Sequence, residues 1–120
     1  MNNNYELEVY ESLKELGIPP SLSGYRYISS IVTKYLTGEC NLTNKFMYVY
    51  TKTAKEFNVT TSRVERAIRH SVQVCFMNAD TDTLYKYFGG TISQSSGKLC
   101  NHAFIMSVVE YIRVHIKKEL

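Results

Sequence analysis

The chain has 120 residues, 44% of them hydrophobic and 21% charged, and its formal net charge at pH 7 is +3. These values fit one globular domain and exclude a disordered chain or two separate cores. No apolar run reaches the ~18 residues of a membrane span, and the start Met1-Asn-Asn-Asn is unlike a secretory signal, so a cytoplasmic protein is expected.

Helical periodicity dominates the sequence, and a convincing alternating strand pattern is hard to find. We therefore expect an all-α fold, a six-helix single domain over residues 1–120. The first helix should span Tyr5 to Leu16 and end at Gly17 and Pro19. Its outer face carries four glutamates, which makes it unsuited to a polyanion: Glu6, Glu8, Glu11 and Glu15.

The second helix is expected over Gly24 to Leu36, with Ser21 or Ser23 as its cap and Gly38 at its end. Its apolar residues recur at helical spacing, which indicates a buried scaffold helix. A third helix is expected over Asn44 to Tyr50, where three residues are apolar: Phe46, Met47 and Val49.

The segment Tyr50 to Thr60 supplies a shorter helix and a tight turn, and a long helix follows from Thr60 to Met77. Asn58 lies at the turn, where asparagine is the best non-glycine candidate for a positive φ. Together the two helices form a helix-turn-helix unit of about 50–77. Its inward positions are apolar apart from the first: Thr53, Ala54, Phe57, Val59, Val64, Ala67 and Ile68.

A short helix near Thr81 to Phe88 should stop at Gly89-Gly90, and the composition of Ser93 to Gly97 is typical of an irregular loop. Asn101 can cap a last helix that runs to about Lys117. Five apolar residues of that helix recur at helical spacing: Phe104, Ile105, Val108, Val109 and Ile112.

The long helix after the turn has two unlike faces. One is an apolar stripe of Val64, Ala67, Ile68, Val72 and Cys75. The opposite face holds Ser62, Arg66, Arg69 and Gln73, with Arg63 and His70 on one flank and Glu65 on the other. Three arginines three residues apart suit a helix that lies in the major groove of DNA.

The basic excess is concentrated on this unit. Residues 45–76 contain six basic and two acidic residues, a balance of +4, whereas the rest of the chain contains eight basic and nine acidic residues, a balance of −1. A patch of this kind is what attraction to phosphate needs. A merely solvated polar face is the competing interpretation.

Three side chains on the helix leave alternatives open. Arg66 is the best base reader, because a guanidinium can bond guanine O6 and N7 together. Glu65 can contact cytosine, complete a Ser62-x-x-Glu65 capping box, or pair with Arg69 at i,i+4. If Thr60 caps the helix instead, Glu65 is freer to read a base. His70 is either a phosphate donor or an ordinary half-buried histidine.

Other chemistry is weakly indicated. Cys40, Cys75 and Cys100 are widely spaced and include no Cys-x-x-Cys pair, so reduced, mostly buried thiols are expected. Cys100 and His102 make only two ligands without a second pair, which favours a structural role over a metal site. The sequence shows no nucleophile elbow and no phosphate loop, so neither an enzyme nor a cofactor is expected.

At this point the residues resemble a known family, the C-terminal effector domain of stage zero sporulation protein A, a response regulator of endospore-forming bacteria. The likeness is strongest in Ala54-Lys55, Phe57-Asn58 and Ser62-Arg-Val-Glu-Arg-Ala-Ile-Arg-His70. It extends from about Leu13 to Lys117 through Leu16 to Pro19, Gly24-Tyr25, Phe88-Gly89, Thr91 and Asn101 with Phe104-Ile105.

The resemblance implies an all-helical domain that recognises short promoter boxes, often as tandem copies, and contacts RNA polymerase sigma factor. It implies that Ser62, Glu65 and Arg66 approach bases, while Arg63, Arg69 and His70 serve mainly the DNA backbone. Lys117 is the nearest counterpart of a lysine that approaches DNA from the last helix. We therefore predict a sequence-specific transcription regulator in which Lys52 and Lys55 also bind phosphates.

The chain also departs from the family. It has no room for the receiver with its phosphorylated aspartate, so a constitutive domain, or a fragment or standalone relative controlled by abundance, is expected. Met77 to Leu84 matches the sigma-factor region, with Asn78, Asp80 and Asp82 as candidate contacts, but differs in residue type. Glu56 replaces a lysine and Thr53 an apolar residue, which should reduce phosphate attraction and inter-helix packing.

The alternative function is a protein-interaction module or antagonist. Such a protein would engage a sibling regulator or sigma factor without binding DNA specifically. The Met77 to Leu84 segment and the acidic first helix are the features that would serve it.

Overall fold

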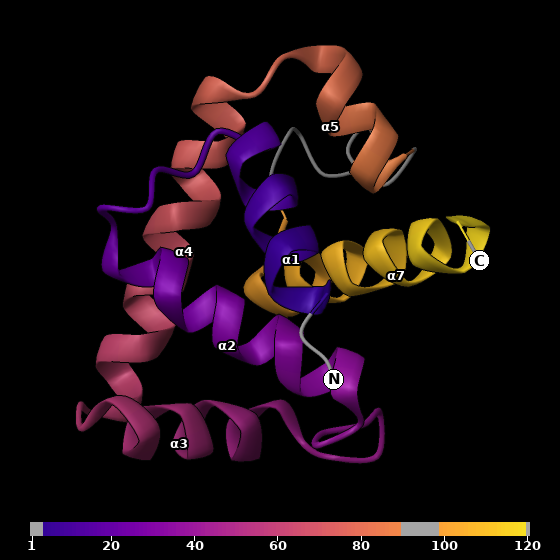
Figure 1. The fold of residues 1–120 in the computed structure, drawn as a ribbon. Helices are drawn as coiled ribbons and strands as arrows, with labels where there is room; N and C mark the ends of the chain where they lie inside the picture. The colour runs from indigo at the N-terminus through magenta and orange to yellow at the C-terminus, as the bar shows by residue number, and fades with distance from the viewer. Residues whose placement is uncertain (1–3, 90–98, 120) are drawn as a thin grey trace.

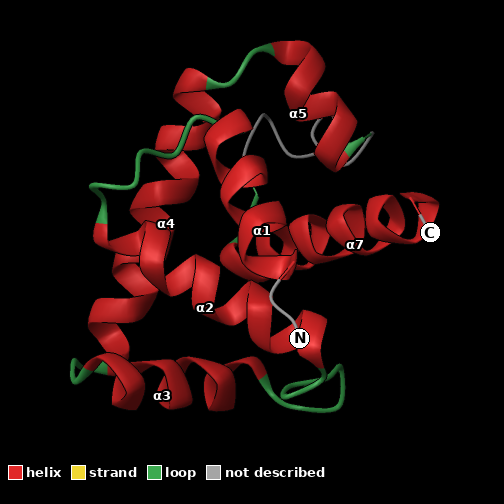
Figure 2. Ribbon diagram, in the orientation of Figure 1, coloured by secondary structure: helices red, strands yellow, loops and turns green. Residues whose placement is uncertain are grey.

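The computed structural model describes residues 4–89 and 99–119, and only the backbone of Asn4 and of residues 116–119. Within these ranges the chain forms six α-helices and no strand (Figures 1 and 2), which confirms the predicted fold class. The helices are α1 (Asn4–Glu15), α2 (Ser23–Thr37), α3 (Phe46–Phe57), α4 (Thr61–Asn78), α5 (Thr81–Phe88) and α7 (Asn101–Glu119). None of them, as far as described, has the length and apolar content that a membrane span requires.

Helix α2 is the centre of the molecule. It packs most extensively on α4 and also contacts α1, α3 and α7, and Figure 1 shows it crossing the middle of the fold. Its Ile28, Ile31 and Val32 have no exposed surface. The apolar residues predicted for the last helix are also buried, from Phe104 to Ile112. Removing this apolar surface from water is the main stabilising contribution to the fold.

Glycines end the first two helices as predicted. Gly17 follows α1 with a φ of +80°, and Gly38 caps α2 with a φ of +89°. The predicted start of α2 is wrong, however. Leu22 is the N-cap, and no side chain bonds to the free N–H groups there. Leu22 packs against the core, so an apolar contact fixes where the chain enters the helix, and Ser23 is already helical.

The boundary expected near Tyr50 is absent. Residues expected as a helix over 44–50 and a shorter one after it form the single helix α3, because residues 50–57 contain no glycine or proline to break it. Met47, one of the three apolar residues in this segment, is 60% exposed, because the buried side of α3 runs through Val49, Tyr50, Thr53 and Ala54.

The second half of the chain follows the predicted pattern except at Asn101. Asp80 caps α5 by accepting a hydrogen bond from Thr83 N at 2.8 Å, and Gly89 ends that helix. The predicted loop over 93–97 lies outside the described residues. Asn101 is the first residue of α7 rather than its cap, and its side chain bonds to other helices.

The cysteines are free thiols, as expected. Cys40 and Cys75 are buried and Cys100 is exposed. In the described ranges no group of three or more metal-ligating side chains occurs, and the imidazole of His102 stacks on Phe46 with a centroid separation of 4.5 Å.

Helices α2 and α4 lie in close contact at Gly24. A Cβ atom at this position would lie 2.4 Å from the carbonyl oxygen of Ala67 and 2.1 Å from Oγ of Ser71. Real atoms do not come that close, so only a residue without a side chain permits this approach. The contact fixes the middle of α4 against the scaffold helix.

Gly24→Ala should therefore destabilise the protein by about 1 to 3 kcal/mol, because the new methyl group must push α4 away from α2. The measurement is the midpoint of urea unfolding. Ser23→Ala is the matched control in the preceding residue and should change stability by less than about 0.5 kcal/mol. A loss of about 1 kcal/mol in the control would mean that Ser23 caps α2 after all.

Candidate nucleic-acid interface

Helices α3 and α4 form the predicted helix-turn-helix. Figure 1 shows them meeting at one corner of the molecule and running in clearly different directions. Asn58 caps α3 with φ 57° and ψ 48°, and it is the one non-glycine residue with a positive φ in the described ranges. Val59 N then donates to the carbonyl oxygen of Ala54 at 2.9 Å, which closes the turn. The prediction that Asn58 adopts this conformation is confirmed.

The inward residues of the unit are buried or half-buried. Thr53, Val64 and Ile68 have no exposed surface. The hydroxyl of Thr53 donates to the carbonyl oxygen of Val49 at 2.9 Å, so this polar residue is satisfied within its own helix. Phe57 packs edge-on against Tyr27 of α2, with a centroid distance of 5.1 Å. The unit is therefore held to the scaffold by apolar contacts on both of its helices.

Thr60 sets the start of α4. Its Oγ1 accepts a hydrogen bond from Arg63 N at 3.1 Å, in the usual geometry of a threonine N-cap. The Ser62-x-x-Glu65 capping box is therefore not the cap of this helix. Ser62 lies in the first turn with its side chain exposed, and Glu65 lies one turn inside the helix.

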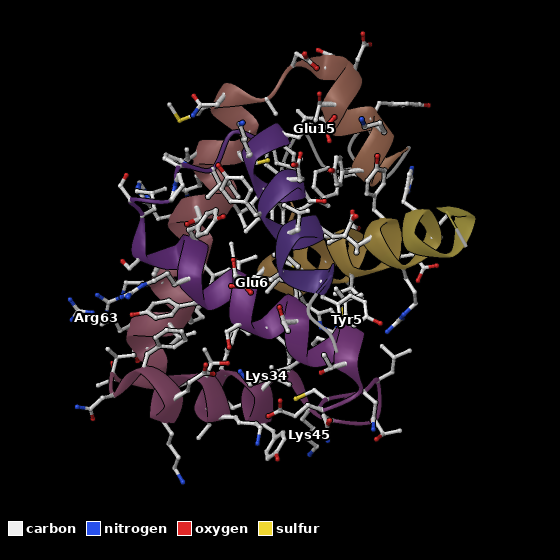
Figure 3. All side chains as sticks on the ribbon, viewed as in Figure 1. Tyr5, Glu6, Glu15, Lys34, Lys45 and Arg63 are labelled. Carbon is white, nitrogen blue, oxygen red and sulfur yellow. The ribbon has the colours of Figure 1, made fainter. Side chains whose placement is uncertain are left out.

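The outer face of α4 is open to solvent. The four residues predicted to point outward are exposed: Ser62, Arg66, Arg69 and Gln73. Arg63 and His70 on the flank are exposed as well, and Figure 3 shows Arg63 projecting from the edge of the molecule. The opposite stripe of the helix is buried except for the half-buried Ala67. The exposed position of His70 removes the half-buried interpretation of that residue.

Glu65 pairs with Arg69 across one turn of α4. Nη2 of Arg69 lies 2.7 Å from each carboxylate oxygen of Glu65, and the two side chains are 40% (Glu65) and 51% (Arg69) exposed. A surface pair at this spacing contributes about 0.3 to 0.5 kcal/mol. The pair is therefore weak enough to open when a stronger partner approaches either group.

Helix α3 carries the two predicted lysines beside an unexpected ion pair. Lys55 is exposed, and Lys52 is half-buried with its Nζ 3.5 Å from Glu39. Glu56 accepts hydrogen bonds from Ser30 Oγ at 2.8 Å and from Nζ of Lys34 at 2.6 Å. Lys34 is buried, and Figure 3 shows it between α2 and α3. The negative charge that Glu56 adds to α3 is thus neutralised from inside the protein.

The surroundings of Glu56 also change its titration. Desolvation raises its pKa, but the hydrogen bonds from Lys34 and Ser30 and the nearby positive charges lower it more, so the pKa of Glu56 lies below its ordinary value of 4.5. The carboxylate therefore stays charged over a wider pH range and keeps the buried Lys34 paired.

Asn101 is a residue that sequence reasoning placed in the wrong role. Its Nδ2 donates to Oη of Tyr50 at 2.9 Å and to the carbonyl oxygen of Glu65 at 3.1 Å. One side chain of α7 thus contacts both helices of the helix-turn-helix unit. No local signal could reveal this, because the partners lie 51 and 36 residues away.

The residues predicted to contact a partner lie at the end of α4 and the start of α5. Asn78 donates to the carbonyl oxygen of Gly17 at 3.1 Å, and Asp80 is the cap of α5, so both also have structural roles. Asp82 is exposed in the first turn of α5. The backbone of Lys117 belongs to α7, and its side chain is outside the described part of the chain.

The family of the sporulation initiation factor Spo0A C terminal matches residues 9–112, from the middle of α1 to the buried part of α7. The chain belongs to this family. The Spo0A C-terminal family is one of helical, DNA-binding domains that regulate transcription in sporulation, and it is not a family of enzymes. The resemblance inferred from the residues is confirmed.

The ion pair between Lys34 and Glu56 predicts how this domain responds to acid. A group whose pKa is lowered by folding stabilises the native state above its unfolded pKa, and that contribution is lost as the pH falls through its folded pKa. We expect the urea midpoint to fall between about pH 6 and about pH 3, and to fall less in Glu56→Gln.

Glu6→Gln removes the same charge at an exposed position on α1 and is the control. It should keep the acid dependence of the native protein. Identical pH profiles for the native protein and Glu56→Gln would show that the pair adds no pH-dependent stability.

Proposed function

We propose that the chain is a sequence-specific DNA-binding transcription regulator in which the first half of α4 enters the major groove. The observation that carries this proposal is the exposed arginine face of α4 opposite its buried stripe. Membership of a DNA-binding family supports it. The helix-turn-helix places α4 at a corner of the molecule, where a duplex can approach its outer side (Figure 1).

Within this arrangement the side chains have two kinds of task. Ser62, Glu65 and Arg66 should contact base edges, because they lie in the first turns of the helix and Arg66 can bind guanine through two hydrogen bonds. A second set should bind phosphates from the flank of α4, from α3 and from the end of α7: Lys52, Lys55, Arg63, Arg69, His70 and Lys117. Phosphate contacts supply affinity, and base contacts supply the preference for one sequence.

A second proposed interaction involves the junction of α4 and α5. Met77 near the end of α4 is 81% exposed, and Tyr85 on α5 is 65% exposed. Asp82, which is also exposed, lies in the first turn of α5. Exposed apolar side chains beside acidic ones are typical of protein-contact surfaces. We propose that this junction contacts RNA polymerase sigma factor. We also propose that two copies of the domain bind adjacent promoter boxes in tandem.

The same junction favours the alternative function as an interaction module without specific DNA binding. The two functions differ in one experiment: the native protein is incubated with a pool of random duplexes, and bound duplexes are sequenced over several rounds. Enrichment of one motif supports the regulator, and recovery of no motif supports the interaction module. A duplex of the enriched sequence is the selected duplex, and a duplex of the same bases in shuffled order is the scrambled duplex.

Arg66→Ala should lower the preference for the selected over the scrambled duplex by about 1 to 3 kcal/mol, because two hydrogen bonds to a guanine are lost. Arg63→Ala should weaken binding to both duplexes alike and reduce the salt slope by about 1, because a phosphate contact is lost. Gel-shift titrations at two salt concentrations measure both effects.

Lys14→Ala removes a positive charge at an exposed position on α1 and should leave the affinities for the selected and scrambled duplexes near the native values. Equal losses on both duplexes for Arg66→Ala and Arg63→Ala alike would contradict the division between base and phosphate contacts.

Glu65→Ala distinguishes the two remaining roles of that residue. The change removes a negative charge beside Arg69 and should raise the affinity for the scrambled duplex. If the carboxylate also accepts a hydrogen bond from cytosine, as we propose, the preference for the selected duplex should fall by about 1 to 3 kcal/mol. An equal rise on both duplexes would assign Glu65 to the pair with Arg69 alone. The same titrations report both outcomes.

A further inference from the structure

The start of α7 is joined to the helix-turn-helix by a polar contact that the proposed DNA interface does not use. The amide of Asn101 donates to Oη of Tyr50 on α3 and to the carbonyl oxygen of Glu65 on α4. One side chain thus connects three helices. Among the described residues, Asn101 is the one side chain outside the helix-turn-helix that hydrogen-bonds to the backbone of α4 between Arg63 and Arg69.

Both acceptors of the Asn101 amide are firmly held. Tyr50 is 5% exposed, and its ring packs on Phe46 at a centroid distance of 4.8 Å. The carbonyl of Glu65 belongs to a continuous helix, where it is also the expected acceptor for the amide of Arg69. A donor between two fixed acceptors restricts how far either can move relative to the other.

The position of this contact along α4 gives it a particular consequence. The middle of α4 is held by Gly24 of α2, and its end is held by the hydrogen bond from Asn78 to Gly17. The first half carries the proposed base-contacting residues Ser62, Glu65 and Arg66, and the Asn101 contact lies on the same turns. A small rotation or shift of these turns would move a side chain off a base edge, because such contacts need placement within about 0.5 Å.

We propose that Asn101 is a positioning residue for DNA recognition, which fixes the first half of α4 relative to α3 and α7 through Tyr50 and Glu65. The inference rests on the proposed function of α4. Asn101 does not contact DNA in this scheme. It keeps the base-contacting side chains in register, so its loss should reduce sequence preference more than affinity for duplexes in general.

The test compares four variants with the native protein on the selected and scrambled duplexes. Asn101→Ala removes both hydrogen bonds, and Asn101→Asp keeps the shape but replaces the donor by an acceptor. Tyr50→Phe removes one acceptor. Tyr87→Phe is the matched control, because Tyr87 is also buried and its hydroxyl bonds to Glu15, away from the helix-turn-helix.

Asn101→Ala and Asn101→Asp should each lower the preference for the selected duplex by about tenfold, with a smaller loss in Tyr50→Phe. Affinity for the scrambled duplex should change by less than about twofold, since phosphate contacts tolerate small shifts. Tyr87→Phe should keep the native preference. Native preference in a folded Asn101→Ala protein would overturn the proposal. If that variant does not fold, Tyr50→Phe decides, and a preference equal to that of Tyr87→Phe overturns it.

Hydrogen exchange without DNA separates this inference from the proposed function. In Asn101→Ala the amides of residues 62–69 should exchange faster than in the native protein, while those of residues 72–78 should change little. If the native protein selects no motif from the random pool, the proposed function fails, and the exchange result alone judges the contact. Faster exchange in the first half then supports the restraint of α4 by Asn101 but not a role in DNA recognition, and unchanged exchange overturns the restraint as well.

Discussion

The close approach of α4 to α2 is the constraint on which the interface depends. A helix can present arginines on one side only if its other side is held, and here the buried stripe of α4 faces the scaffold while Gly24 lets the two backbones meet. A larger residue at that point would move the whole helix, and the outer face with it. The function of the exposed side chains is therefore set by a position that has no side chain.

The charged groups of the helix-turn-helix differ in whether they are already paired within the molecule. Residues 45–76 carry a balance of +4, but several groups have partners inside the molecule. Lys34 enters from α2 and cancels Glu56, and Arg69 is shared with Glu65. Among the described residues, Arg63 and Arg66 of the outer face have no carboxylate partner, and both lie at the end of α4 that we propose enters the groove.

The sequence alone predicted what depends on neighbours along the chain. The two faces of α4, the turn at Asn58 and the glycine ends of α1 and α2 follow from periodicity and backbone preference, and all are present. The failures depend on distant contacts. Leu22 replaces a serine as the cap of α2 because the core holds it, and Asn101 turns from a cap into a link between helices because Tyr50 and Glu65 lie beside it. The roles of individual side chains on DNA remain predictions.

The ion pair between Glu65 and Arg69 has a consequence for the energetics of DNA binding. The positive charge of Arg69 is already neutralised by Glu65 within α4. Binding of this guanidinium to a phosphate would therefore release fewer condensed counterions from the duplex than binding of an isolated arginine would. A phosphate of the duplex would then partly replace Glu65 as the partner of Arg69. Dissociation from DNA would restore the pair with Glu65, so the release of Arg69 from a phosphate would cost less free energy than the release of an unpaired arginine.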